Sequence, residues 1–272
     1  FGITPDTSFF YECGSIRAGL NVLLVAASNG DGFIKITGEV GTGKTLLCRK
    51  LLATLDERKW VTAYIPNPNL EPRTLIRALG DELELELADG LDEHQLLRAF
   101  NIGLLDLARD KKRVIVCLDE SQAMPLETLE TMRLLTNLET EKRKLIQVVL
   151  FGQPELDAKL ADPAIRQLKQ RIIFQHRLTG LTGAETGHYL EHRLQIAGYR
   201  GDRVFSNAAA RLIAARSRGT PRLINILAHK ALMVAYGRGS RVVTWRDAKE
   251  AVRDTPATPR GGLAWLTSMI MR

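Results

Sequence analysis

The sequence has no hydrophobic run long enough to form a membrane-spanning helix, and it has few cysteines. A spanning helix needs about 20 apolar residues, whereas the longest run late in the chain, LAWLTSMIM at 263–271, has nine. No charged and then apolar leader opens the chain, so we expect no secretory signal in it. The three cysteines, Cys13, Cys48 and Cys117, are odd in number and widely spaced. They argue against a disulfide framework and are typical of a reducing cytoplasm.

Negative charge is scarce in the second half of the chain. Residues 161–272 hold 19 Lys and Arg against 7 Asp and Glu, whereas residues 1–160 hold 19 against 24. A basic half of this kind could face nucleic acid or an anionic membrane surface. Alternatively, basic helices could surround a bound nucleotide. Both interpretations stay open on charge alone.

The first half of the chain alternates short apolar runs with helical patterns. The third apolar run, RVIVCLD, is almost continuous, as is typical of a strand buried on both faces of a parallel sheet. Helical spacing between the runs includes 73–87, 94–109 and 126–138. This alternation predicts an α/β fold with a five-stranded parallel sheet sandwiched by helices. The five predicted strands are 33–37, 61–65, 113–119, 145–151 and 171–176.

No strand pattern follows residue 176, and the remaining patterns are helical. Thr182 with Glu185, and Thr244 with Asp247, are spaced as capping residues that open helices. Further helices are predicted from 206 and from 221, which gives a small all-helical domain of four helices. The predicted organisation is an N-terminal linker or helix at 1–30, an α/β core at 31–177, the all-helical domain at 178–254 and a loose tail at 255–272.

A glycine-rich segment lies between the first predicted strand and the helix after it. GEVGTGKT, at 38–45, matches G-x-x-x-x-G-K-[ST] at every fixed position. In such a loop the backbone amides and the helix N-terminus converge on phosphate groups. Lys44 would reach the β- and γ-phosphates of a bound triphosphate, and the Thr45 hydroxyl would bind Mg²⁺. The predicted nucleotide-binding residues are Glu39, Val40, Gly41, Thr42, Gly43, Lys44, Thr45 and Leu46.

An acidic pair ends the third predicted strand. Asp119 would hold the Mg²⁺, usually through water, because ligands of open parallel sheets bind at the carboxyl ends of the strands. Glu120 would act as the general base that polarises the attacking water. The alternative is an ordinary acidic strand end. A kinase acting on a small molecule would need an acceptor site, and the sequence offers no candidate for one.

Four further polar residues are candidates for a role in hydrolysis. Gln153 follows the fourth strand and could orient water or sense phosphate, or it could only cap the next helix. Arg171 precedes the fifth strand, where in a ring assembly it could reach a neighbour's nucleotide. Arg166 is the second candidate for that role. Arg222 opens a helix of the all-helical domain, from which it could reach the γ-phosphate. Solvated arginines are the alternative for all three.

Several of these segments together resemble a known family. GEVGTGKT, LDE, FGQ, QRI and GTPR, followed by helices, are similar to the AAA+ ATPases. FGITPDTSFFY, LDESQAM, LTNLET and VLFGQPEL resemble the general secretion pathway protein A (ExeA-like) group within that family. Within the group, the resemblance is greatest to biogenesis proteins of the mannose-sensitive haemagglutinin (MSHA) type IV pilus. It covers about residues 1–253.

The resemblance carries several expectations. It implies Mg²⁺-dependent ATP hydrolysis linked to secretin or pilus assembly at the inner membrane, with nucleotide-dependent self-association. It implies a cytoplasmic or peripheral location, a mobile helical lid, and Tyr11 or a neighbour near the adenine. Many relatives continue into a membrane helix and a periplasmic peptidoglycan-binding domain, whereas this sequence stops at Arg272, so we do not expect cell-wall binding. Ser121 stands where relatives usually have Ala.

Two other functions remain as alternatives to an assembly ATPase. A DNA-binding AAA+ regulator, such as a transposition or replication accessory protein, would use the basic second half. The absence of room for a winged helix after Arg253 weakens an initiator role. A nucleotide-controlled binding module would bind ATP and scarcely hydrolyse it. Loss of turnover in Glu120→Gln with retained ATP binding would separate this module from an ATPase.

Overall fold

The chain divides into two compact units. The computed structural model describes residues 1–2, 9–30, 32–137, 139–140 and 143–256. One unit, here the α/β unit, spans Pro5–Thr179, and the other, the helical unit, combines Phe1–Thr4 with Gly180–Arg272. Most of the opening PD-x-x-F-x-Y stretch and nearly all of the predicted tail lie outside the described residues.

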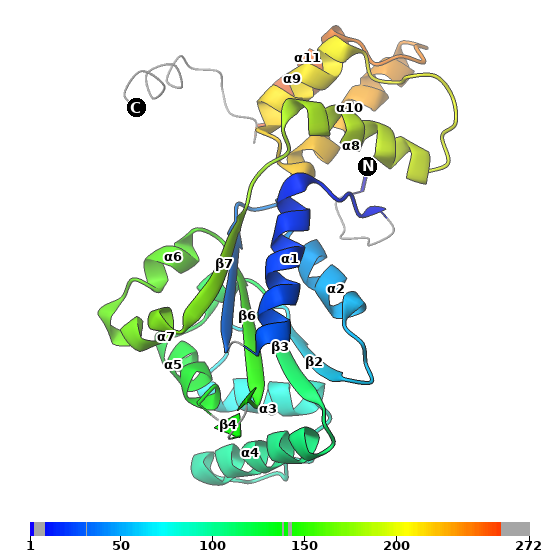
Figure 1. Cartoon of the computed structure of the whole chain (residues 1–272). Coiled ribbons are helices and arrows are strands. Elements are labelled where there is room, and N and C mark those ends of the chain that lie inside the picture. Colours follow the sequence, from blue (N-terminus) through cyan, green and yellow to red (C-terminus); the bar gives the residue numbers. More distant parts are fainter. Residues whose placement is uncertain (3–8, 31, 138, 141–142, 257–272) are drawn as a thin grey trace. The chain divides into compact units, whose positions relative to one another are not determined.

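A five-stranded parallel sheet forms the centre of the α/β unit (Figure 1). All its strand pairs are parallel, and the order β2-β3-β6-β1-β7 places β3, β6 and β1 inside the sheet. Every residue of β6 is buried, which is why its sequence is almost entirely apolar, with Gln147 as the polar exception. The predicted sheet is therefore confirmed. The strands are β1 (Phe33–Gly38), β2 (Trp60–Ile65), β3 (Arg113–Leu118), β6 (Ile146–Gly152) and β7 (Ile172–Leu178).

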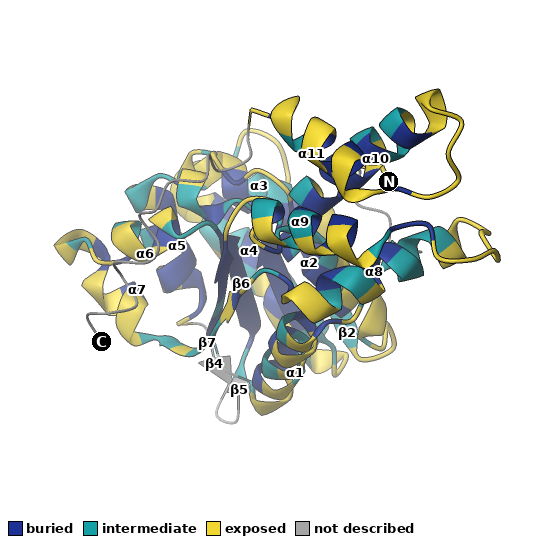
Figure 2. Ribbon diagram, turned by 90° about the horizontal axis from the view of Figure 1, so that it is seen from above, coloured by how far each residue is buried: buried dark blue, intermediate teal, exposed yellow. Residues whose placement is uncertain are grey.

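Helices lie on both faces of this sheet, and most residues of its central strands are buried (Figure 2). Fully buried Phe33 and Phe100 belong to one core cluster that also includes Leu79 and Leu104. The apolar stripes of the helices thus explain the helical periodicity of the sequence. These helices are α1 (Gly14–Asn29), α2 (Lys44–Thr54), α3 (Pro72–Glu82), α4 (Glu93–Arg109), α5 (Leu126–Leu135), α6 (Glu155–Lys159) and α7 (Arg166–Gln170).

The end of α3 differs from the prediction of a helix over 73–87. The helix ends at Glu82, and Glu84 takes a left-handed conformation with φ of 55°. The N–H of Leu85 donates to the carbonyl of Gly80 at 2.9 Å, so the chain turns back over the helix end. Leu87 then packs so closely that a Cβ on Gly80 would lie 2.2 Å from it. Burial of these leucines therefore ends the helix early.

The end of α5 also comes earlier than the predicted residue 138. The hydroxyl of Thr136 donates to the carbonyl of Arg133 at 2.8 Å and so satisfies a terminal carbonyl of the helix. A short antiparallel pair follows, β4 (Glu139–Thr140) with β5 (Arg143–Lys144). The sequence pattern did not indicate this pair.

The helical unit contains four helices in the part of the chain that the structure describes. Capping boxes at Thr182 with Glu185, and at Thr244 with Asp247, are both present as predicted. A buried hydrogen bond from the Tyr189 hydroxyl to Asn225, at 3.0 Å, links two of the helices. The helices are α8 (Gly183–Ile196), α9 (Asn207–Ser217), α10 (Pro221–Gly237) and α11 (Trp245–Arg253). Across the described ranges, no helix has the length and hydropathy to traverse a bilayer.

Candidate nucleotide site

The glycine-rich loop joins β1 to α2. Gly41 and Gly43 have φ of 80° and 103°, which side chains other than glycine rarely adopt. Thr42 closes the curve, because its N–H and its hydroxyl both donate to the carbonyl of Glu39, at 3.3 and 2.8 Å. Gly43 is the N-cap of α2, so the unpaired amides of the first helical turn open at the end of the loop. This geometry suits a phosphate chain.

Lys44 lies inside the curve of this loop. Its side chain is buried, and its ammonium donates to the carbonyls of Gly38 and Glu39 at 2.8 and 3.2 Å. Burial lowers the pKa of Lys44, and this effect exceeds the opposing influence of nearby carboxylates, of which Glu120 and Asp119 act most strongly. The ammonium and the two acids therefore share one electrostatic environment.

The Thr45 hydroxyl and the Asp119 carboxylate are in direct contact. The hydroxyl donates to Asp119 Oδ2 at 2.5 Å, and the Tyr64 hydroxyl approaches the same oxygen at 3.4 Å. Asp119 is 3% exposed, and its other oxygen accepts the N–H of Glu120 at 2.9 Å. Burial and then the Asp119 charge raise the pKa of Tyr64, so its hydroxyl stays protonated. A hydroxyl and a carboxylate at one point are the oxygen ligands that Mg²⁺ prefers, so these residues fit that ion.

Glu120 takes a left-handed backbone conformation, with φ of 51°. Its Oε2 accepts a hydrogen bond from Gln153 at 2.9 Å and a second from Gln122 at 2.5 Å. Burial raises the pKa of Glu120, but these two bonds and the Lys44 charge outweigh it and hold the pKa below its usual value. The carboxylate is therefore ionised at neutral pH and able to accept a proton.

The structure thus brings five of the predicted residues together: Lys44, Thr45, Asp119, Glu120 and Gln153. Within the loop, Val40 is 51% exposed and Leu46 is half-buried. Tyr11 is half-buried ahead of α1, and the N–H of Cys13 donates to its carbonyl at 3.1 Å.

The predicted arginines lie in other surroundings. The guanidinium of Arg171 donates to the carbonyl of Arg133 at 3.1 Å and lies 3.5 Å from the Thr136 hydroxyl, at the end of α5. Arg166 is exposed, and its guanidinium makes no hydrogen bond or ion pair with any other residue that the structure describes. Arg222 is exposed in the first turn of α10, in the helical unit.

Two site residues were missed by sequence reasoning. Gln122 bridges Glu120 and Gln153, and Tyr64 reaches Asp119. Both residues could have been found from the parallel pairing of β2, β3 and β6. Tyr64 is paired with Cys117, and β3 lies beside β6, so the ends of three strands meet at one edge. Because that pairing depends on the order of the strands, a linear motif does not contain it.

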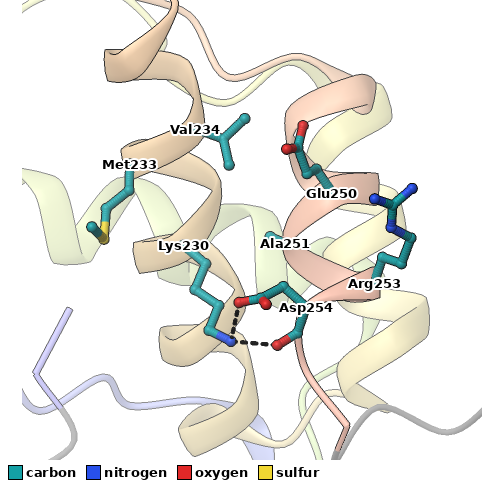
Figure 3. A pocket seen from close by; sticks show the side chains of 7 residues that line it. All are labelled: Lys230, Met233, Val234, Glu250, Ala251, Arg253 and Asp254. Atoms are coloured by element: carbon teal, nitrogen blue, oxygen red, sulfur yellow. Dashed lines mark hydrogen bonds and ion pairs between the residues drawn. The ribbon is translucent and has the colours of Figure 1, made fainter.

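A separate pocket of about 360 Å³ lies in the helical unit, between α10 and α11 (Figure 3). Lys230 on one wall donates to the backbone and side-chain oxygens of Asp254, at 2.6 and 2.8 Å. None of the predicted site residues lines it. The residues around it are Lys230, Met233, Val234, Glu250, Ala251, Arg253 and Asp254.

The sequence of the chain is similar to those of known proteins. Residues 27–160 match the family model described as AAA domain. Over 247 residues, 91% of this chain, the sequence is 39% identical to General secretion pathway protein A of Aeromonas hydrophila. The alignment covers 45% of that protein, so the chain spans less than half the length of this curated relative.

Solved structures show the same fold at low sequence identity. The ORC2 protein of Aeropyrum pernix, in ADPNP-ADP complexes, is similar with a TM-score of 0.67 and 18% identity, over 99% of this chain and 75% of that one. Cdc6p from Pyrobaculum aerophilum gives 0.68 and 18%, over 92% and 70%. The RuvB Holliday junction branch migration motor of Thermotoga maritima gives 0.57 and 16%, over 93% and 73%. The fold is therefore that of an AAA-type P-loop protein, and the match supports ATPase activity.

Proposed function

From this AAA-type P-loop fold, we propose that the chain is a Mg²⁺-dependent ATPase that drives or regulates assembly of a secretion apparatus or a type IV pilus. One observation carries the proposal of hydrolysis. The Thr45 hydroxyl contacts Asp119, the charges of Asp119 and Glu120 act on the Lys44 ammonium, and the Glu120 carboxylate is ionised. Binding alone would need the loop and the metal ligands but no general base.

The loop residues would hold the triphosphate of ATP. Backbone amides from Gly41 to Leu46 and the N-terminus of α2 supply hydrogen bonds and a positive dipole end. Lys44 adds a full charge that is already desolvated, so its interaction with phosphate oxygens is stronger than in water. Tyr11, ahead of α1, is proposed to cover the adenine.

Thr45 and Asp119 would hold Mg²⁺, which when bound supplies charge neutralisation on the phosphate oxygens. Glu120 would accept the proton of the attacking water, because its carboxylate is ionised and anchored. Gln153 donates to Glu120 through its side chain and would orient the same water or contact the γ-phosphate. The hydrogen bonds of these groups support the proposed roles.

An arginine from a second copy of the chain is proposed to complete the site. Such a residue stabilises charge in the transition state and is worth about 10³–10⁵ in rate in well-studied systems. Arg166 fits this role better than Arg171, because Arg171 would first have to leave the carbonyl of Arg133. The helical unit is proposed to act as a mobile lid, with Arg222 as its contact to the γ-phosphate.

The biological role is proposed from the secretion relative. The 39% identity extends over 91% of this chain, which is more than the AAA domain alone. We propose that the client is an assembly protein of a type II secretion system or of an MSHA-type pilus. We further propose that the chain works at the cytoplasmic side of the inner membrane as a nucleotide-dependent homo-oligomer.

ATP turnover of Glu120→Gln tests the proposal. Removal of a general base costs about 10²–10⁴ in rate, so turnover should fall by at least about 100-fold, while affinity for a fluorescent ATP analogue should stay within about twofold. Glu127→Gln on α5 is the matched control, because that carboxylate is exposed. If the wild-type protein shows no turnover at any protein concentration, the chain is a nucleotide-controlled binding module.

A DNA-binding regulator is the second candidate, and the basic second half of the chain favours it. Phosphate contacts release counterions, so such a protein should bind duplex DNA with an affinity that falls steeply as salt rises. Titration of labelled DNA at two salt concentrations, with and without ATP, measures this. Tight, salt-sensitive binding would favour the regulator over the assembly ATPase.

A further inference from the structure

Gln122 connects the two strand ends that carry Glu120 and Gln153. Its side-chain nitrogen donates to Glu120 Oε2 at 2.5 Å, and its side-chain oxygen accepts the backbone N–H of Gln153 at 3.0 Å. The first contact lies at the end of β3 and the second at the end of β6. One side-chain amide therefore joins the proposed general base to the segment proposed to sense phosphate.

The orientation of this amide is fixed by its partners. The backbone N–H of Gln153 can only donate, so the oxygen of the Gln122 amide must face it and the nitrogen must face Glu120. Lys159 also holds the backbone on which this side chain stands, because its ammonium donates to the carbonyls of Gln122 and Met124 at 2.6 and 2.5 Å. Gly152 also leaves room, since a Cβ there would lie 3.2 Å from the amide oxygen. The side chain thus has one well-determined position.

The two hydrogen bonds to Glu120 end on the same oxygen atom. Gln122 and Gln153 both donate to Oε2, and Oε1 accepts no hydrogen bond from the part of the chain that the structure describes. Two donors on one carboxylate oxygen fix the direction of the group and leave the second oxygen as a proton acceptor. A misplacement of about 1 Å in such a group can cost 10²-fold in rate.

We propose that Gln122 is a positioning residue for hydrolysis: it directs Glu120 Oε1 toward the attacking water and keeps Glu120 within hydrogen-bond distance of Gln153. This inference rests on the proposed ATPase function. It assigns no chemistry to Gln122 itself, which acts only through the carboxylate.

Two variants of Gln122 distinguish the effect of its hydrogen bonds from the effect of its volume. Gln122→Met keeps the length and volume of the side chain and removes both hydrogen bonds, and Gln122→Ala also removes the volume. Both should lower kcat for ATP by about tenfold or more, with the affinity for a fluorescent ATP analogue within about twofold. Gln147→Ala is the control, because it removes a buried glutamine of β6 whose side chain makes no hydrogen bond to Glu120 or Gln153. Normal kcat in Gln122→Met would overturn the proposal.

A double-mutant cycle distinguishes positioning from general loss of structure. If Gln122 acts through Glu120, then Gln122→Met should not lower the residual turnover of Glu120→Gln any further. Independent effects that multiply would show that Gln122 has a structural role and would overturn the proposal. If Glu120→Gln alone leaves turnover intact, the proposed function itself fails, and that outcome is distinct from the other two.

Discussion

At the scale of single residues, the site depends on which oxygen atoms face the glycine-rich loop. Thr45 and Asp119 meet at 2.5 Å, and the paired oxygens are within the α/β unit that carries Lys44. A hydroxyl and a carboxylate bind a divalent cation well only while the carboxylate keeps its charge. Removal of the charge of Asp119 should therefore weaken Mg²⁺ binding more than removal of the charge of any exposed acid.

Asp119→Asn should raise the Mg²⁺ concentration needed for half-maximal turnover by about tenfold or more, because the amide retains one oxygen and loses the charge. Titration of ATPase activity with Mg²⁺ measures this. The control is Asp56→Asn, whose carboxylate is 49% exposed and pairs only loosely with Lys59, at 3.9 Å. An unchanged Mg²⁺ requirement in Asp119→Asn would remove Asp119 from the metal site.

Single residues also show which parts of the candidate site can be predicted from the sequence. Lys44, Thr45 and Glu120 lie in short motifs, where the spacing itself requires the chemistry. Gln122 and Tyr64 enter the site through strand pairing, and nothing in their own neighbourhood indicates it. The contacts of Arg171 with the end of α5 likewise depend on tertiary packing, which spacing does not contain.

At the scale of elements, the ends of helices were the least predictable feature of the fold. Capping boxes such as Thr182 with Glu185 are local in sequence, and the helix begins where they predict. The end of α3 is decided by leucines that pack back onto it, and this competes with helical propensity. Strands were predictable because β3 and β6 are buried on both faces and are therefore mainly apolar.

The start of α11 gives a prediction that depends on pH. Burial raises the pKa of Asp247, but hydrogen bonds from Thr244 and the charge of Arg238 outweigh it, so the pKa lies below its usual value. Ionised Asp247 therefore stabilises the fold above the ordinary pKa of about 3.9, and this contribution is lost as pH falls through the lowered folded value.

Asp247→Asn should lower the free energy of unfolding by about 1–2 kcal/mol at pH 7. Urea denaturation at pH 7 and near pH 3 measures the difference between variant and wild type, which should shrink at the lower pH. Glu250→Gln is the control, because it removes the other acid that pairs with Arg238 but is exposed. A difference that is the same at both pH values would contradict the role of the charge.

The turn between α9 and α10 gives a second prediction at this scale. Gly219 has φ of 72°, and a Cβ there would lie 2.0 Å from the carbonyl oxygen of Leu181. Gly219→Ala should therefore cost at least about 2 kcal/mol in unfolding free energy. At Gly237, in the last turn of α10, a Cβ would meet nothing within 4 Å, so Gly237→Ala should be neutral or stabilising. Equal melting temperatures for the two variants would show that the turn tolerates a side chain.

At the scale of the whole molecule, the proposed trans-acting arginine makes activity a property of the assembly. The Arg166→Ala variant keeps an intact glycine-rich loop but would supply no arginine to a neighbouring copy. The Lys44→Ala variant would supply this arginine, but its own glycine-rich loop does not work. A mixture of the two should regain turnover that neither shows alone, with a rate that rises with concentration. Turnover measurements on the mixture, and on the corresponding mixture with Arg171→Ala, identify the arginine. No recovery in either mixture would argue against catalysis in trans.

The convergence of Lys44, Thr45, Asp119 and Glu120 on one bound nucleotide is tested most directly by a crystal structure of Glu120→Gln with ATP and Mg²⁺. We expect the triphosphate to lie along residues 41–46, with Mg²⁺ next to the Thr45 hydroxyl and Asp119, and with the side chain at position 120 facing the γ-phosphate. A nucleotide bound elsewhere, or a metal ion held without Thr45 and Asp119, would contradict the proposed site.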